Sequence, residues 1–492
     1  MKKDQIRKGR LGTERSRQVL RYLSSMEADR WIGEADILVD MAHLLMLHHQ
    51  KLIGPEHARA LLRVLLEVQG QGLPDQVFDE QFEDVHAGLE AYLIERAGED
   101  AGGRIHMGRS RNDEVSACLR IRLRGDLLRC MQSLVRLREV LFTLCEAHRD
   151  AVMPGYTHLQ PAQPTTLPHH LLAYEQALGR DFDRFRAAFL HVNLSPLGAA
   201  AFAATGYPID REMTAHLLGF DQLLGNSMDA VASRDFILET LAAGAILMTG
   251  LSRLAEDLIL WSTPAFGFVT LEDAFCSASS VMPQKKNPDT LEILRAKAGT
   301  AHGSFTGALS IMKGLPMSYN RDLQEVTPHL WRGMTTVLES TELLTQVLQG
   351  AAFDEKRMAQ EAGKGFSTAT DLADMLVRSH NLPFRTAHTI VGRAVRRGSL
   401  DLRVLEAAAQ EAAGISLIQR GVTAEEVNRA LDVPMAIASR NVPGGPAPEA
   451  VAQALRERKR VHRQDTAWVL SQEKAIQEAL SQLLARAREL VA

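Results

Sequence analysis

The sequence predicts an all-α protein built on a central bundle of long helices, and three observations support this fold class. Aromatic residues make up only 5% of the chain, whereas Leu, Ala, Arg and Glu abound, a composition that favours helices over sheets. Long proline-free segments alternate with short proline-rich ones, as expected when prolines are excluded from helix interiors. Apolar residues in the long segments recur at helical spacing, so each helix is expected to bury one face against its neighbours.

The expected helices follow one another along the chain. Shorter helices at 35–52 and 55–69 come before the longest one, 114–152, which would span about 55 Å at 1.5 Å per residue. Four more long helices follow, at 168–192, 229–262, 288–312 and 330–352. A shorter helix is expected at 370–379, and the stretch 442–448 is too rich in Pro and Gly for regular structure. We therefore expect three helical domains: an N-terminal one at 1–111, the long bundle at 112–361 and a small C-terminal one at 362–492.

Composition excludes several classes of protein. The net charge is -4 at pH 7, so no general basic field is present to bind nucleic acid. The most apolar stretch, 241–251, is much shorter than the roughly 20 apolar residues of a membrane span. Charged residues follow Met1, so no signal peptide is visible, and the four cysteines show no CxxC pairing. These features predict a cytoplasmic protein that binds neither membrane nor nucleic acid.

Two polar segments flank the longest predicted helix. The first, 103–114, opens that helix, where Ser110 or Asn112 can cap it and Arg109 and Arg111 offer guanidinium groups suited to carboxylates. A helix cap with solvent-facing arginines explains the same residues, and both interpretations stay open. The second, 155–164, holds His158 among hydroxyl and amide groups. Single histidines are mostly structural, but one in a polar loop is a better candidate for general acid or base.

Two further polar segments lie beside the later long helices. In 277–289, serines and two lysines lie between prolines just before a helix, which favours a mobile lid over a nucleotide loop because no phosphate-binding glycine spacing is present. A solvated loop explains the lysines but not the serines beside them. The segment 317–325 would by itself be a surface turn. The adjacent pairs His48–His49 and His169–His170 lack the i, i+4 spacing of a helical metal site, so neither metal nor cofactor is predicted.

Several of these segments together resemble one family. The sequence SSVMPQKKNP at 279–288 resembles the signature loop of the fumarase/aspartase superfamily, and QKKNPD is similar to its argininosuccinate lyase branch. Further blocks match at 83–86, 108–113, 156–160, 226–230 and 319–325, in the family's order. The resemblance implies three helical domains around a five-helix bundle. It also implies a homotetramer in which three subunits contribute to each active site.

The resemblance also implies the reaction. Argininosuccinate would be split by β-elimination into arginine and fumarate, as in arginine biosynthesis, without a cofactor. Ser279 would be the base and Lys285 would stabilise the charge that develops. His158 would protonate the leaving nitrogen or orient the water that does so, and Glu292 would pair with that histidine. The substrate-binding residues would be Ser110, Arg111, Asn112, Thr157, Asn287, Tyr319, Gln324, Arg321, Asp84 and Asp40.

The chain departs from the family pattern at two of its positions. Many members have a serine in place of Asp40 and a lysine in place of Thr327, and both positions lie at the amino-acid end of the substrate in the family. Compared with those members, this end of the site has lost a cation and gained an anion. Two alternatives therefore stay open: a lyase that acts on another N-succinyl amine, or one that adds an amine to fumarate. An inactive structural homologue is a third reading, against which the full set of reacting residues argues.

Overall fold

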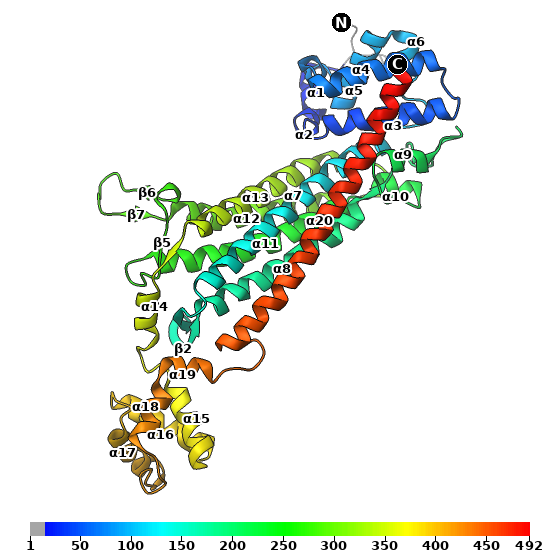
Figure 1. Cartoon of the computed structure of the whole chain (residues 1–492). Coiled ribbons are helices and arrows are strands. Elements are labelled where there is room, and N and C mark those ends of the chain that lie inside the picture. The colour runs from blue at the N-terminus through cyan, green and yellow to red at the C-terminus, as the bar shows by residue number, and fades with distance from the viewer. Residues whose placement is uncertain (1–14) are drawn as a thin grey trace.

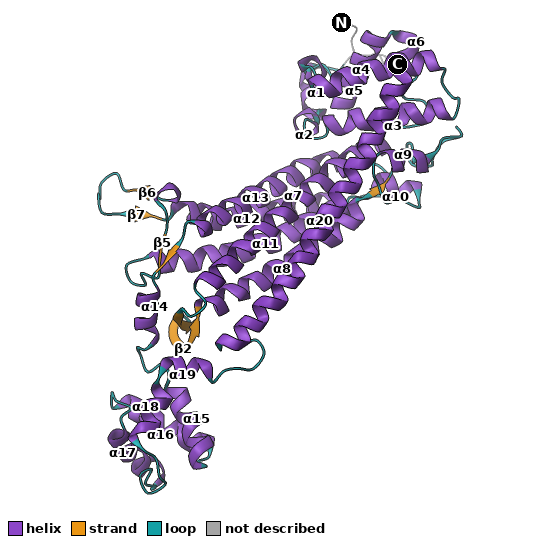
Figure 2. Ribbon diagram, viewed as in Figure 1, coloured by secondary structure: helices purple, strands orange, loops and turns teal. Residues whose placement is uncertain are grey.

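The described chain is mostly helical, with a few short strands, which confirms the predicted fold class (Figure 2). The computed structural model describes residues 15–492, so the first 14 residues of the expected N-terminal domain lie outside it. An elongated helical bundle separates two smaller groups of helices (Figure 1). We call the group formed by residues 17–102 the head and the group formed by residues 369–431 the tail, and we name the two ends of the bundle after them.

The head consists of short and medium helices that pack over the start of the bundle. Its main helices confirm the predicted ones within three residues at each end. They are amphipathic or fully buried, and Ile32, Leu61 and Leu93 are completely enclosed in the core. The helices are α1 (Arg17–Leu23), α2 (Met26–Asp29), α3 (Gly33–His49), α4 (Pro55–Gln71), α5 (Val85–Ala97) and α6 (Glu99–Gly102), with a 3-10 turn at Asp75–Phe78.

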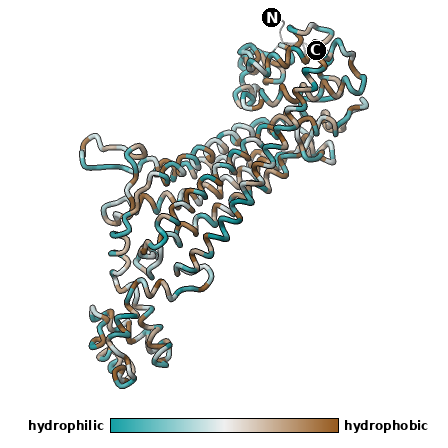
Figure 3. Tube along the Cα trace, in the orientation of Figure 1, coloured by the Kyte–Doolittle hydropathy of each residue, from teal (hydrophilic) through white to brown (hydrophobic). Residues whose placement is uncertain are grey.

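All five predicted long helices are present in the bundle. Apolar residues alternate with polar ones along each of them (Figure 3), and their apolar faces form one continuous core with the head. They are α7 (Arg111–Ala147), α8 (Leu167–Val192), α11 (Asp235–Ser262), α12 (Asp289–Met312) and α13 (Leu323–Gln349). By length and composition alone α11 could cross a membrane, but it packs inside the bundle against α8, α12 and α13.

Three predicted boundaries were wrong for local reasons. Helix α7 ends at Ala147 because a hairpin strand begins at Val152. A separate helix, α10 (Ser227–Ala232), precedes α11, because the chain bends at Arg234, whose buried guanidinium donates to the Val231 and Ser233 carbonyls. Helix α13 starts seven residues earlier than predicted because it tolerates Pro328 near its N-terminus.

A sixth long helix, α20 (Pro448–Val491), was not predicted. It has 44 residues and returns from the tail end of the bundle to the head, packing on α7, α8 and α4 (Figure 1). Ion pairs with buried partners attach it to the bundle: Asp465 of α20 contacts Arg138 of α7 at 2.7 Å, and Arg458 of α20 contacts Glu175 of α8 at 2.6 Å. The three domain boundaries stay predictions, but α20 lies along the bundle and not with the tail.

The remaining elements are short. The tail has a small core of its own, separate from that of the bundle. Its helices and their neighbours are α14 (Glu355–Ala362), α15 (Ala369–His380), α16 (Phe384–Arg396), α17 (Leu402–Ala413), α18 (Ala424–Leu431) and α19 (Val433–Ala438). Near the head lies α9 (Arg211–Leu217).

The described strands form four two-stranded pairs. Three are antiparallel: β1 (Val152–Thr157) with β2 (Gln160–Thr166), β5 (Val269–Thr270) with β8 (Ala352–Phe353), and β6 (Ser277–Ala278) with β7 (Lys286–Asn287). The fourth pair, β3 (Leu194–Ser195) with β4 (Gln222–Leu223), is parallel. The β1–β2 and β6–β7 hairpins both lie toward the tail end of the bundle (Figure 1), and each carries predicted catalytic residues.

Candidate active site

The segment Ser110–Asn112 starts the longest bundle helix at the head end. Ser110, one of the two predicted caps, is the N-cap of α7: its hydroxyl accepts from the Asn112 N–H at 3.3 Å. In return, Asp113 Oδ1 accepts from the Ser110 N–H at 3.0 Å, which completes a capping box. The other oxygen of Asp113 accepts from the backbone of Gly198 at 2.9 Å and Ala200 at 2.8 Å. The segment is therefore fixed both to its own helix and to the 198–200 loop.

Asn112 and Arg111 are half-buried and face the rim of the head. Asn112 Nδ2 donates to the Ala201 carbonyl at 2.9 Å. Arg111 contacts Asp84 at 3.3 Å and Glu90 at 3.4 Å, both from the head. Asp84 also caps α5 by accepting from the Ala87 N–H at 2.8 Å. A guanidinium at a helix N-terminus, surrounded by backbone donors, suits an anionic ligand such as a carboxylate.

Arg109 does not face a ligand, contrary to the possibility that the sequence left open. Its guanidinium is buried, and the same nitrogen, Nη2, contacts Asp40 at 2.5 Å and Glu114 at 2.9 Å. Asp40 itself, predicted as a substrate-binding residue, is 2% exposed on α3. Thr327, the other departure from the family pattern, is 5% exposed on α13. Both residues point into the protein in this chain.

A second buried pair lies against the first. His86 Nδ1 contacts Asp36 at 2.8 Å and approaches Glu114 at 4.0 Å. Burial lowers the pKa of His86, but the Asp36 carboxylate outweighs that effect and the pKa rises to about 10. Burial raises the pKa of Asp40 and of Glu114 more strongly than Arg109 lowers it. The head end of the bundle thus encloses three carboxylates with two cations.

Three more predicted residues lie at the head end, just before and in the first turn of α13. Arg321 forms an ion pair with Glu83 and donates to the Leu23 carbonyl at 2.8 Å. Gln324 donates to the same carbonyl at 3.1 Å, and Tyr319 is half-buried and interacts electrostatically with Arg234. Since Glu83 precedes Asp84, which contacts Arg111, the structure brings these residues and Ser110–Asn112 to one region.

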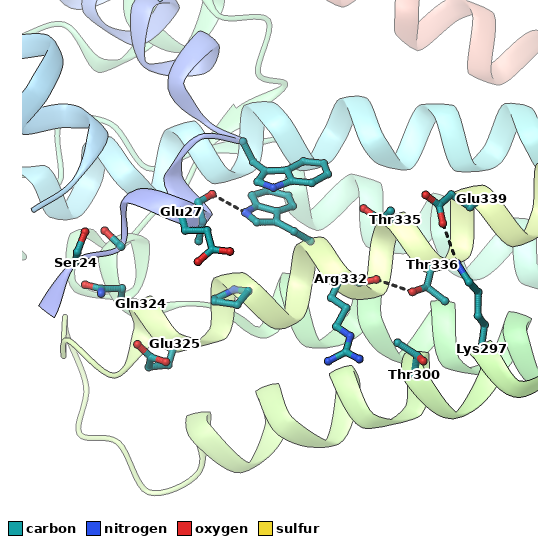
Figure 4. A pocket seen from close by; sticks show the side chains of 15 residues that line it. Ser24, Glu27, Lys297, Thr300, Gln324, Glu325, Arg332, Thr335, Thr336 and Glu339 are labelled. Atoms are coloured by element: carbon teal, nitrogen blue, oxygen red, sulfur yellow. Dashed lines mark hydrogen bonds and ion pairs between the residues drawn. The ribbon is translucent and has the colours of Figure 1, made fainter. Parts of the chain in front are cut away.

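A cavity of about 690 Å³ opens beside this region, between residues 24–31 and helices α12 and α13. Gln324 lines it at one end, and Figure 4 shows Lys297 and Glu339, paired at 2.9 Å, at the other. Trp31 and Trp331 stack with ring centres 5.5 Å apart along one wall. The cavity therefore extends from a predicted substrate-binding residue along the outer side of α13.

Thr157 and His158 lie on the exposed tip of the β1–β2 hairpin, at the tail end. His158 and Leu159 form the turn, with φ values of 55° and 58° in the left-handed region. Leu159 is 72% exposed, and the His158 ring has no hydrogen-bond partner among residues 15–492. A strained turn that presents an unbonded imidazole is consistent with a functional role for His158.

Ser279 and Lys285 lie on the loop of the β6–β7 hairpin, which projects from the side of the bundle (Figure 1). The Ser279 hydroxyl oxygen accepts from the backbone N–H of Met282 at 3.0 Å and of Val281 at 3.3 Å. Lys285 is exposed and has no ion pair within the described chain. Asn287, in β7, donates to the Ser277 hydroxyl at 3.5 Å.

Sequence reasoning missed the role of the second lysine of this loop. Lys286 Nζ donates to the Leu271 carbonyl at 2.6 Å and to Asp273 at 2.5 Å. It therefore ties the base of the hairpin to the preceding turn, while Lys285 stays exposed. Two adjacent lysines look alike in the sequence. No signal in the sequence separates them, because Lys285 ends the loop and Lys286 begins β7.

The described chain does not bring all the predicted residues together. Glu292, exposed in the first turns of α12, makes no contact with His158 in the part of the chain that the structure describes. Ser110–Asn112 and the β1–β2 hairpin lie at opposite ends of α7, whose 37 residues span about 55 Å. A single chain therefore holds two separate halves of the predicted site.

Comparison with known proteins identifies the family. Residues 9–303 match the family model described as "Lyase", and residues 366–438 match the one described as "Argininosuccinate lyase C-terminal". The argininosuccinate lyase of Methanoculleus marisnigri is 58% identical over 492 residues, which cover all of both chains. The chain belongs to the argininosuccinate lyase family. The enzyme of that name from Methanospirillum hungatei is 53% identical, with 100% of this chain and 99% of the other covered.

A solved structure supports both the family and the fold. The structure of an EDDS lyase in complex with formate is 32% identical, with a TM-score of 0.88, and the match covers 98% of this chain and 96% of the other. Because the match covers 98% of this chain, it includes both ends of the bundle, and the two proteins share the long-bundle fold.

Proposed function

We propose that this protein is a carbon–nitrogen lyase that splits argininosuccinate into arginine and fumarate in arginine biosynthesis. The observation that carries the proposal is identity above 50%, over essentially the full length, with two proteins named argininosuccinate lyase. The residues that the reaction requires are also present on accessible loops or at the start of α7. Their order and positions support a β-elimination.

The elimination needs a base, a site for the charge that develops and a proton for the leaving group. Ser279 takes the proton from the carbon beside one succinyl carboxylate, and the electrons of that bond move onto this carboxylate. They then form the new carbon–carbon double bond as the carbon–nitrogen bond breaks. Two backbone N–H groups already point at the Ser279 oxygen, and such donors stabilise an alkoxide. His158, or water that it orients, gives the departing guanidino nitrogen its proton, and Glu292 supports the imidazole.

The substrate carboxylates are held by fixed donors. Arg111, with Ser110 and Asn112, binds one of them at the N-terminus of α7, where the helix dipole also favours an anion. Lys285 and Asn287 stabilise the carboxylate that becomes dianionic when the proton is removed. Thr157 adds a hydroxyl donor, and Tyr319, Arg321 and Gln324 meet the arginine end.

We also propose that the active site is completed by assembly into a homotetramer. The two groups of residues are about 55 Å apart in one chain, so at least two copies must meet to form one site. Ala296, Gly299 and Gly303 are exposed on one side of helix α12, and the open space beside the two glycines allows another helix to approach closely. Ile293 and Ile246 are 59% and 48% exposed on α12 and the neighbouring α11, as expected for apolar surface covered by another copy.

The buried position of Asp40 argues against a different amine. The alternative of another N-succinyl amine rests on Asp40 and Thr327, and both side chains are buried within the chain, Asp40 against Arg109. One observation favours this alternative: a protein with the same fold is named EDDS lyase, not argininosuccinate lyase. An inactive homologue would have no need for the reacting residues.

The protein is proposed to act in the cytoplasm without a metal or cofactor, nucleic acid or membrane. The oxygens of Asp36, Asp40 and Glu114 are close enough together to hold a cation. Arg109 and His86 already lie against them, however, and occupy the positions from which a metal would neutralise the carboxylates.

The test is fumarate formation, followed by its ultraviolet absorbance, when purified protein is given argininosuccinate in the presence of a chelator. We expect steady turnover that added metal does not increase. A folded protein that fails to release fumarate from argininosuccinate, yet adds other amines to fumarate, would support the alternative substrate.

A further inference from the structure

We propose that Asp40 is a positioning residue: with Glu114 it clamps Arg109 inside the protein and thereby fixes the segment Ser110–Asn112. The inference rests on the proposed function and deepens it, because that segment is proposed to bind a succinyl carboxylate. Asp40 itself does not touch the substrate.

The clamp joins two elements through one nitrogen. Asp40 comes from α3 in the head and Glu114 from α7 in the bundle, and both contact Arg109 Nη2, at 2.5 Å and 2.9 Å. All three side chains are less than 5% exposed. Arg109 Nε and Nη1 have no hydrogen-bond partner in the described chain, so the two carboxylates supply the polar contacts of the guanidinium. A buried charge held this way cannot move without leaving a carboxylate unpaired.

A second contact from the same helix holds the same loop. His43, three residues after Asp40 on α3, contacts the Met107 carbonyl through Nε2 at 2.9 Å. Between these two anchors lies Gly108, whose φ of 74° is in the left-handed region and whose added Cβ would meet Ile209 at 3.1 Å. Residues 107 and 109 are thus held from α3 on both sides of a tight turn. Ser110 follows directly as the helix cap.

The position of the buried Arg109 side chain determines where the next three residues lie at the surface. Arg109 points inward, while Ser110, Arg111 and Asn112 are half-buried and face the rim. If Arg109 lost one carboxylate, its guanidinium would settle on Glu114 alone and the turn before Ser110 would shift. A displacement of a few tenths of an ångström at binding donors weakens ligand binding without removing any reacting group.

Two acids, Asp40 and Glu114, lie beside the single guanidinium of Arg109. Asp36 and His86 neutralise each other, which leaves Glu114 and Asp40 to share Arg109. A serine at position 40 would have a shorter side chain that does not reach Arg109. Its hydroxyl would also carry no negative charge. This chain therefore holds its anion-binding segment with a buried ion pair where many family members have a neutral side chain.

The experiment compares Asp40→Asn and Asp40→Ser with the wild-type protein. We expect the KM for argininosuccinate and the inhibition constant of fumarate to rise together by roughly tenfold, with kcat within about twofold, since uniform binding is lost. Asp40→Glu, which keeps the charge, should recover part of the loss. Melting temperatures are measured on every variant.

Asp465→Asn is the matched control. Asp465 pairs with buried Arg138 at 2.7 Å in the middle of the bundle, so the variant also breaks a buried ion pair but lies far from Ser110–Asn112. It should lower the melting temperature and leave KM unchanged. If Asp40→Asn behaves like Asp465→Asn, with a lower melting temperature and unchanged fumarate affinity, the positioning role is wrong. Should the wild type not turn over argininosuccinate, the proposed function fails, and calorimetric titration with fumarate still decides the role of Asp40.

Discussion

The two ends of the bundle hold their halves of the proposed site in opposite ways. At the head end, Ser110–Asn112 is fixed by a capping box, by backbone contacts to 198–200 and by a buried ion pair. At the tail end, Ser279 and His158 lie on exposed hairpins, and His158 has no hydrogen-bond partner in the described chain.

The difference matches the work each half would do. Groups that bind a ligand gain from rigidity, because less entropy is lost when the ligand arrives. Groups that react must approach the substrate after it has bound, so they are better placed on loops that can close over it. The head end would therefore determine affinity, and the tail end would determine the rate of the chemical step.

The largest effect is expected when two variants, each defective in a different half of the site, are combined in one tetramer. Arg111→Ala removes a head-end group and Ser279→Ala a tail-end group, and each variant alone should lose activity by about 10²- to 10⁴-fold. Mixed, unfolded and refolded together, the two inactive variants should regain a readily measured part of wild-type fumarate formation, because some sites would receive both intact halves from different copies.

Two controls accompany that experiment. Ser279→Ala with Lys285→Met places both changes on the loop of the β6–β7 hairpin, so no copy in that mixture carries this loop intact, and Arg111→Ala refolded alone gives the background. Light scattering should show four copies per particle throughout. If the Arg111→Ala and Ser279→Ala mixture stayed as inactive as its components in folded tetramers, one chain would have to supply both halves, against the geometry proposed here.

A smaller effect is expected at the hairpin base. Lys286→Met removes the contacts to Leu271 and Asp273 but keeps the length of the side chain. The Ser279 loop would lose an anchor, so kcat should fall roughly tenfold while fumarate affinity holds. The melting temperature should not change, since exposed ion pairs contribute little to stability. Lys285→Met serves as the comparison: it should abolish turnover, and equal kcat values for the two variants would mean that their roles are not distinct.

The smallest effect concerns pH and belongs to the head end alone. Burial raises the pKa of Asp40 and Glu114, and a carboxylate with a raised pKa in the folded state loses stabilisation as the pH rises through that value. His86, raised to about 10, acts in the same direction above pH 6.5. The titratable groups that interact with Asp40 are Asp36, His86, Arg109, Glu114 and Cys118.

The expected outcome is a melting temperature that falls by about 1–3 °C between pH 6 and pH 9. In Asp40→Asn one carboxylate no longer titrates, so this slope should flatten, and Lys286→Met should keep the wild-type slope. Calorimetry of the three proteins across this range is the measurement. A slope that Asp40→Asn leaves unchanged would place the titrating groups elsewhere.

Much of the bundle could be predicted because helix interiors show a regular pattern. Apolar spacing and proline positions located all five long helices, and the residue pattern singled out Ser110 as one of two candidate caps. Helix α20 escaped because its sequence is rich in charged residues, and the Pro-rich stretch before it suggested the end of regular structure. Its mostly polar surface hides the few residues, such as Val469 and Leu483, that pack on the bundle.

The candidate site was predicted as a set of residues but not as an arrangement. Local motifs marked Ser279, His158 and Arg111, because each lies in a compact polar segment. No local pattern could show that Arg109 turns inward to a residue on α3, because that contact joins positions 69 residues apart. Opposite charges far apart in a sequence give no sign of which will pair.

Helix α20 also bears on how the chain is made. Its last turns pack against the head, where Arg59 Nε donates to the Leu490 carbonyl at 2.9 Å and Leu483 and Ala487 are completely buried. The head thus combines an early and a late segment of the described chain. During synthesis, the apolar surface of the head that α20 covers would stay exposed to solvent until α20 had been translated. The lifetime of that nascent intermediate, and its need for chaperones, is set by the time taken to translate everything in between.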